Sequence, residues 1–144
     1  VSVPVIVNGD IIDADSARAA LEQSGADAVM IGRGAYGRPW IAAALNQALA
    51  QGSQAVEPCL AERLVIALEH FTESLRFYGD AWGLKIFRKH LGWYVERALW
   101  PADPATRRML RAQICQIDNP GDVERALVAL WTKSALSIPA PLPI

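Results

Sequence analysis

The sequence has few of the features that mark secreted, membrane and metal-binding proteins. Its 144 residues include only two cysteines and two histidines, which argues against a disulfide framework and a zinc site. No apolar run approaches the ~18 residues of a membrane span. The first apolar run also lacks the preceding basic region that is typical of a signal peptide. With 52% hydrophobic residues and a net charge of −1, the composition predicts a soluble, cytoplasmic globular protein and identifies no partner.

The few cysteines and histidines carry no recognisable motif. Cys59 and Cys115 fall on predicted helices, where free cysteines usually pack as small hydrophobes, so we expect buried thiols rather than nucleophiles. His90 has no second histidine close to it in sequence. We therefore expect a structural or solvent-facing role for His90, and no metal ligands.

Two short apolar runs, residues 4–7 and 28–31, organise the N-terminal part of the chain. Runs of this length bounded by turn residues predict strands that are buried on both faces, as in a parallel sheet. Between them, Asp13 or Asp15 can cap a helix of about ten residues, and Gly25 is suited to end it. The pattern predicts a parallel strand–helix–strand unit with a right-handed crossover.

Each apolar run ends in a glycine-bearing turn. Gly9, Gly32 and Gly34 lack a Cβ, so backbone amides there can approach an anion. Arg33 adds a guanidinium suited to phosphate, and a short helix expected to begin near Ala35 would add N–H groups. Two such strand ends, one helix apart, match the phosphate site after strands 7 and 8 of a TIM barrel. The alternative is that the glycines only form tight turns.

The rest of the chain is predicted to be helical. A helix from Pro39 to about residue 50 would complete the second βα unit, and a loop at residues 51–57 is the best domain boundary. The predicted domains are residues 1–56, a helical domain at 57–136 and a Pro-rich tail at 137–144. Within the helical domain, four helices are expected, at residues 58–78, 83–99, from Asp103-Pro104 through Ile114, and from Asn119-Pro120 to about 134.

Charge is uneven in the helical domain, with seven basic and two acidic residues between positions 82 and 111. On a helical wheel, Lys85, Arg88 and Lys89 cluster on one face, beside Trp93. A basic face with an aromatic neighbour suits an RNA backbone and an unstacked base. The alternative is an ordinary solvated helix face, with Trp93 packed against the barrel. The candidate RNA-contacting residues are Lys85, Arg88, Lys89, Trp93 and Arg97.

Three segments together resemble the tRNA-dihydrouridine synthases, in particular the bacterial branch once labelled as nitrogen-regulation proteins. The first is Val-Pro-Val-Ile-Val-Asn-Gly-Asp-Ile at residues 3–11, and the second is Ser-Gly-Ala-Asp-Ala-Val-Met-Ile-Gly-Arg-Gly-Ala-Tyr-Gly-Arg-Pro-Trp at residues 24–40. The third, Arg-Lys-His-Leu-Gly-Trp-Tyr at residues 88–94, is similar to the helical-domain signature of that branch. The resemblance extends to about Trp131.

The resemblance implies an FMN-dependent enzyme that reduces the C5=C6 bond of uridines in tRNA, with NADPH reducing the flavin. It implies that the Asn-Gly-Asp turn contacts the flavin and that the following Gly-Arg holds its phosphate, with Gly34 extending that loop. It also implies tRNA contact by the helical domain. The implied flavin-binding residues are Asn8, Gly9, Asp10, Gly32, Arg33 and Gly34.

The length predicts a piece of a longer enzyme, because a complete barrel needs about 250 residues. We expect an α/β part followed by an all-α part: the last two βα units of a TIM barrel and a C-terminal four-helix bundle. The resemblance puts the catalytic cysteine, and a lysine and a histidine that contact flavin and substrate, upstream. We therefore predict no catalytic residue here, an inactive fragment, and weak or absent FMN binding.

The expected fragment would leave sheet edges open, so we also expect a homodimer or a strand swap. Two alternatives to the synthase remain. One is another FMN barrel oxidoreductase acting on a small molecule, and the other is a non-catalytic fragment that binds RNA or itself.

Overall fold

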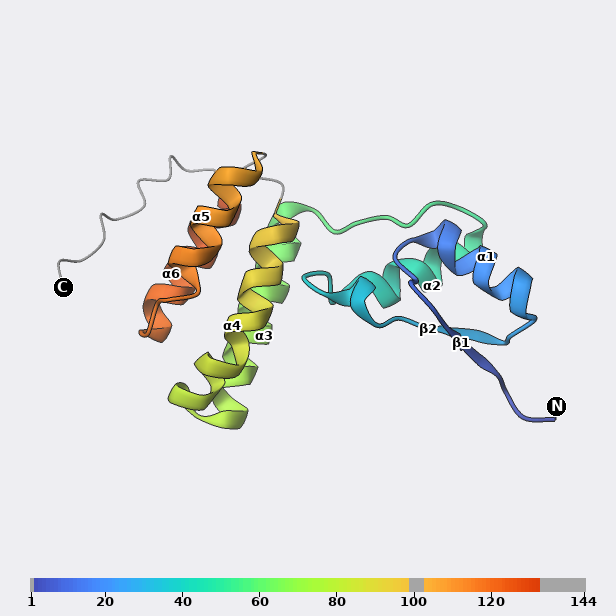
Figure 1. Ribbon diagram of the computed structural model, residues 1–144, viewed down its shortest axis with the longest axis horizontal. Coiled ribbons are helices and arrows are strands. Elements are labelled where there is room, and N and C mark those ends of the chain that lie inside the picture. Colours follow the sequence, from blue (N-terminus) through green and yellow to red (C-terminus); the bar gives the residue numbers. More distant parts are fainter. Residues whose placement is uncertain (1, 99–102, 133–144) are drawn as a thin grey trace. The chain divides into compact units, whose positions relative to one another are not determined.

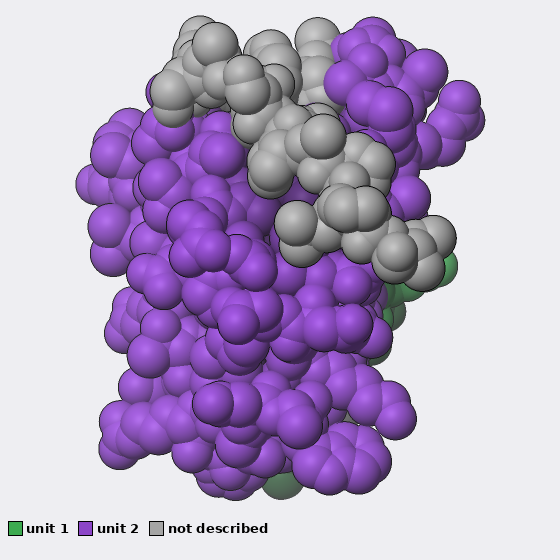
Figure 2. All heavy atoms as spheres, turned by 90° about the vertical axis from the view of Figure 1, so that its left-hand side faces the viewer, with its two compact units in different colours: residues 1–58 green, residues 59–144 purple. Residues whose placement is uncertain are grey.

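In the computed structural model, which describes residues 2–98 and 103–132, the chain forms two compact units, residues 1–58 and 59–144 (Figure 2). The chain is mostly helical, with two short parallel strands in unit 1. The tail predicted at residues 137–144 lies outside the described residues. The elements are β1 (Ile6–Asn8), α1 (Ala14–Ser24), β2 (Ala28–Met30), the 3-10 turn η1 (Arg33–Ala35), α2 (Ile41–Gln51), α3 (Leu60–Tyr78), α4 (Asp80–Arg97), α5 (Pro104–Ile114) and α6 (Pro120–Thr132) (Figure 1).

The predicted strand–helix–strand unit is confirmed. β1 and β2 pair in parallel, with Ile6 opposite Ala28 and Asn8 opposite Met30, and α1 connects them (Figure 1). Parallel neighbours cannot be joined by a tight turn, because the chain must return to the starting edge before the second strand. The two strands therefore end at the same edge of the sheet.

The expectation that both strand faces are buried is wrong for this chain. Val7 and Val29 are half-buried, and Val29 packs against the apolar core formed with α1 and α2. Ile6 and Met30 on the opposite face are 56% and 53% exposed. The physical reason is that the described residues of unit 1 supply one helical layer, so only one face of the sheet is covered.

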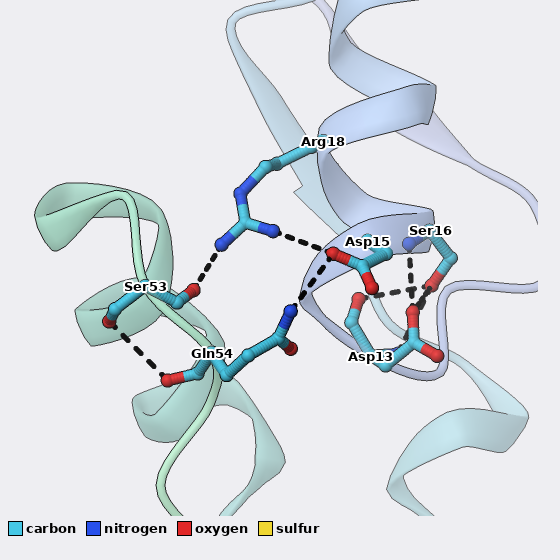
Figure 3. Close-up of polar contacts among 6 residues, drawn as sticks. All are labelled: Asp13, Asp15, Ser16, Arg18, Ser53 and Gln54. Atoms are coloured by element: carbon cyan, nitrogen blue, oxygen red, sulfur yellow. Dashed lines mark hydrogen bonds and ion pairs between the residues drawn. The ribbon is translucent and has the colours of Figure 1, made fainter.

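Helix α1 forms where its capping residues predict it. Asp13 is the N-cap, and its Oδ1 accepts a hydrogen bond from the Ser16 amide at 2.8 Å. Gly25 ends the helix in the left-handed conformation, with φ of 64°, which costs glycine little. Figure 3 shows Arg18 of α1 donating to the Ser53 carbonyl oxygen after α2, so polar contacts join the two helices on this side of unit 1.

The segment after η1 differs from the prediction at Pro39. Helix α2 begins at Ile41 rather than Pro39, because the Ile41 amide donates to the Arg38 carbonyl and closes a turn at 3.0 Å. The Trp40 indole donates to Glu57 Oε2 at 2.6 Å, and the Arg38 guanidinium forms an ion pair with Glu57. These contacts fasten the segment that follows α2 to the start of that helix.

Unit 2 is built on a tight helical hairpin. Only Gly79 separates α3 from α4, so the two helices run back along each other (Figure 1). The predicted helix start at Gly83 is wrong, since α4 already begins at Asp80. A Cβ on Gly83 would lie 2.6 Å from the Ser74 carbonyl oxygen of α3. Gly83 is therefore required by the close approach of the two helices rather than by a turn.

Two further helices belong to the described part of unit 2. α5 packs on α4, while α6 packs on α3 and α4. Asp103 caps α5, as predicted, and accepts from the Thr106 amide at 2.8 Å. The large buried side chains of this unit include Phe71, Phe87, Leu91, Tyr94, Val95, Leu110, Val123, Leu127 and Leu130.

The expectation of two buried thiols is only partly correct. Cys59 is exposed, because it is the N-cap of α3 and lies outside the helix proper. Cys115 is half-buried at the end of α5, and burial raises the pKa of its thiol. A raised pKa keeps this thiol protonated and weakly nucleophilic.

The α3–α4 hairpin also brings together two histidines that are distant in sequence. The rings of His70 and His90 meet edge to face, with centroids 4.6 Å apart. His70 Nδ1 lies 3.1 Å from the Tyr94 hydroxyl. Burial lowers the pKa of both histidines, and for His90, where His70 and Lys89 add to the effect, the pKa falls to about 4. His90 therefore has the structural role we expected, with a partner the sequence did not reveal.

We expect acid to destabilise unit 2 through His90. An unfolded histidine titrates near pH 6.5, whereas folded His90 has a pKa of about 4. The unfolded state binds more protons between these values, so this contribution to stability is complete above about pH 6.5 and is lost as the pH falls toward 4. The partly exposed ring limits the loss to on the order of 1 kcal/mol.

The midpoint of thermal unfolding, followed by circular dichroism between pH 7 and 5, measures this effect. It should fall with pH in the wild-type chain and fall less in His90→Gln. Carboxylates titrate mostly below this window. Equal pH slopes in the two proteins would contradict the assignment.

Candidate anion site and basic helix face

The loops that follow β1 and β2 meet at one edge of the sheet. Arg33, in the second loop, forms an ion pair with Asp10 in the first. Both side chains are largely exposed, at 78% and 82%, so the pair contributes little to stability, about 0–1 kcal/mol. Asp10 has a φ of 43°, a left-handed conformation that aspartate tolerates better than most residues. The ion pair braces the loops, and an incoming anion could compete with Asp10 for Arg33 at small cost.

The three glycines of these loops differ in why glycine is present. A Cβ on Gly34 would lie 2.1 Å from the Ile11 carbonyl oxygen, so packing requires glycine there. A Cβ on Gly9 or Gly32 would meet no atom within 4 Å. Packing within unit 1 therefore does not explain Gly9 and Gly32, and their missing side chains leave space over the backbone. Such space fits the close approach of a phosphate group.

The expectation of a short helix beginning near Ala35 is wrong in both the position and the type of the element. The chain forms the single 3-10 turn η1, in which the Ala35 amide donates to Gly32 and the Tyr36 amide to Arg33, at 3.0 and 3.1 Å. These two amides are engaged within the turn. The helix dipole expected from the sequence is therefore absent at this turn, and attraction for an anion must come from Arg33 and the open loops.

The predicted basic face of α4 is present but uneven. Lys85 and Lys89 are exposed, and so is Arg97 near the end of the helix. Arg88 is half-buried and forms an ion pair with Asp118, which follows α5. Trp93 is half-buried, and its ring and that of His90 pack edge to face at a centroid distance of 5.1 Å. The structure thus places Lys85, Lys89 and Trp93 together and gives Arg88 a contact within unit 2.

Basic residues of α5 are also tied to α4. Arg111 forms an ion pair with Glu96, and Arg107 donates to the Glu96 carbonyl oxygen at 3.1 Å. The excess of positive charge counted in the sequence therefore overstates the charge that a ligand would meet.

Trp82 is a further exposed residue of α4 that was not among the predicted site residues. This side chain is 64% exposed, and Lys85 Nζ lies 4.8 Å from its ring centroid. Trp82 and Lys85 are three residues apart, so on a helix their side chains are neighbours, and this spacing could have identified Trp82 from the sequence.

Residues 2–98 and 103–132 hold no group of three or more His, Cys, Asp or Glu side chains that could bind a metal ion. In the same ranges, no helix is both long enough and apolar enough to cross a membrane.

Comparison with known proteins gives independent evidence on the family. The family model described as dihydrouridine synthase (Dus) matches residues 1–133. A protein of Rhizobium leguminosarum named "Probable tRNA-dihydrouridine synthase" is 50% identical over 136 residues, which are 94% of this chain and 39% of that protein. One of the same name from Rhodobacter capsulatus is 51% identical over 112 residues, covering 78% of this chain and 34% of its own length.

A relative with a more specific name is more distant. "tRNA-dihydrouridine synthase B" of Shewanella oneidensis is 38% identical over 122 residues, which are 85% of this chain and 36% of that protein. The chain thus spans between 34% and 39% of the length of these three relatives. The resemblance predicted from the three segments is confirmed: the chain belongs to the dihydrouridine synthase family and corresponds to a portion of such a protein.

Proposed function

We propose that this chain is the C-terminal portion of a cytoplasmic, FMN-dependent tRNA-dihydrouridine synthase. In this proposal, unit 1 is the last two βα units of the TIM barrel and holds the flavin phosphate. Unit 2 contacts tRNA. The observation that carries the proposal, beside family membership, is the meeting of the two strand-end loops through Arg33 and Asp10.

When bound in the longer protein, FMN would supply the hydride chemistry for reduction of the uridine C5=C6 bond, with NADPH as the reductant. Arg33 would bind the phosphate through its guanidinium fork, exchanging the Asp10 carboxylate for the ligand. Gly9 and Gly32 leave room for the phosphate beside the backbone. Asn8 alternates with Val7 along β1 and so lies on the sheet face away from the helices, where its amide would orient the flavin.

The proton donor is proposed to be the family's cysteine in an earlier barrel loop. Cys59 and Cys115 both belong to unit 2, and neither corresponds to that position. The exposed apolar face of β1 and β2 supports the barrel placement, because inward-facing strand residues fill the interior of a TIM barrel. In the longer protein, Ile6 and Met30 would be covered by the side chains of the other strands.

FMN binding tests the phosphate site. We expect weak, saturable binding by calorimetry, because most isoalloxazine contacts would come from missing strands. Arg33→Ala should weaken it about 10- to 150-fold, since a hydrogen bond to a charged group contributes about 1.5–3 kcal/mol. Arg125→Ala is the matched control, an exposed arginine that is ion-paired with an aspartate in unit 2. Equal affinity of Arg33→Ala and wild type, or of riboflavin and FMN, would contradict the assignment.

Binding of tRNA tests the role of unit 2. Phosphate contacts make the affinity for tRNA fall steeply as salt is added. The logarithm of the association constant for tRNA should therefore decrease linearly with the logarithm of the salt concentration. Arg97→Ala should lower the slope by about one, as expected for one lost phosphate contact. Arg76→Ala, which removes an exposed arginine of α3, should leave the slope unchanged. If both variants match wild type, Arg97 does not contact RNA.

A second candidate property, self-association, is favoured by the open sheet. We propose that isolated chains dimerise or exchange strands through β1 and β2, whose apolar face is exposed at Ile6 and Met30 and which pair only with each other among the described residues. Unpaired strand edges promote such contacts. Light scattering at high concentration should report a dimer, and a monomer would contradict this proposal.

A further inference from the structure

Helix α4 carries two tryptophans at the ends of one stripe that also contains two lysines. At 100° per residue, Trp82, Lys85, Lys89 and Trp93 fall within an arc of about 80°, and at 1.5 Å per residue the two tryptophans are about 16 Å apart along the helix. The first three side chains are exposed and Trp93 is half-buried. We call these four residues the α4 stripe.

Charge along the α4 stripe has one sign. Lys85 and Lys89 stand between the two aromatic rings, and Lys85 Nζ lies over Trp82. Glu96 is the one acidic residue of α4 on this arc, and its carboxylate is ion-paired with Arg111. Asp80 lies about 160° from Trp82 on the helix. The stripe therefore presents positive charge flanked by two aromatic side chains.

The two rings are held differently. Trp93 is packed edge to face against His90, which restricts its orientation. Trp82 lies in the first turn of α4, near the α3–α4 corner, and is 64% exposed. A ring that is already oriented loses less entropy on binding, so Trp93 is suited to be the first ring to hold a ligand. The exposed ring of Trp82 is suited to pack on the ligand afterwards.

We propose that the α4 stripe binds unpaired nucleotides of RNA, with bases stacking on Trp82 and Trp93 and phosphates contacting Lys85 and Lys89. This inference rests on the proposed RNA-binding function and narrows it to single-stranded segments. An aromatic side chain can stack only on a base whose face is exposed, as in a loop or an end. A duplex would use the lysines alone. The separation of about 16 Å between the two tryptophans along the helix corresponds to about five nucleotide steps of a stacked strand. It corresponds to fewer steps of an extended strand.

A protein partner fits the stripe less well. Lysine is depleted at the centres of protein interfaces, whereas two lysines occupy the centre of this stripe. Aromatic platforms beside positive charge are the usual arrangement for single-stranded nucleic acid.

The test compares two RNA ligands on the full chain. Fluorescence anisotropy would measure binding of a labelled single-stranded 12-nucleotide RNA of mixed sequence and of its 12-base-pair duplex, at equal salt. Trp82→Ala should weaken single-strand binding about 5- to 150-fold, the range for loss of one stacked base, and leave duplex binding unchanged. Trp82→Tyr should restore most of the affinity. Val65→Ala, an exposed apolar residue of α3, should change neither.

A second readout separates stacking from charge. Trp82→Ala should leave the salt slope of single-strand binding unchanged, whereas Lys89→Ala should lower it by about one. With 5-bromouridine in the RNA, ultraviolet crosslinks should map to peptides containing Trp82 or Trp93.

The outcomes distinguish this inference from the function on which it rests. If Trp82→Ala binds single-stranded RNA like wild type, or weakens single strand and duplex equally, the stripe proposal is overturned and the RNA-binding function stands. If Trp82→Ala alters the oligomeric state but not RNA binding, the stripe is a contact between copies and the proposal fails. If the wild-type chain binds no RNA at low salt, both proposals fail.

Discussion

The parallel pairing of β1 with β2 is the constraint on which unit 1 depends. Because parallel neighbours must be joined by a crossover, α1 has to lie across the sheet, and its capping residues fix where it starts and ends. The same pairing brings the ends of both strands to one edge, so Arg33 and Asp10 meet although they are 23 positions apart. The topology therefore places the two loops of the proposed anion site side by side, and attraction for an anion there depends on Arg33.

Unit 2 depends on a different constraint, the single residue between α3 and α4. Gly79 turns the chain so sharply that the helices must pack along each other, and Gly83 lets their backbones approach. That register then decides which residues meet and which face solvent. It brings the half-buried rings of His70 and His90 together, and it leaves Trp82 and the two lysines of the α4 stripe exposed.

Local signals in the sequence predicted the main helices, several of their caps and the parallel unit, but not the starts of α2 and α4. Asp13, Gly25 and Asp103 act through neighbours three or four residues away, so their effect can be predicted without tertiary structure. What depends on distant partners could not be predicted. The exposure of Ile6 and Met30 depends on which layers cover the sheet. The contact between His70 and His90 depends on the register of the α3–α4 hairpin. The ion pair of Arg88 depends on where the chain places Asp118. The same holds for the candidate site. Arg33 and the glycines of the two loops could be recognised in the sequence, whereas the 3-10 turn η1 could not.

Two separate ligand sites, one in each unit, are the central claim. A 1H–15N correlation spectrum of the full chain, recorded as FMN and then single-stranded RNA are added, tests it most directly and can detect weak binding. FMN should shift the amide signals of residues 8–10 and 32–34 and leave those of unit 2 in place, whereas RNA should shift the signals of α4. Shifts in unit 2 on adding FMN, or the same signals responding to both ligands, would contradict the claim.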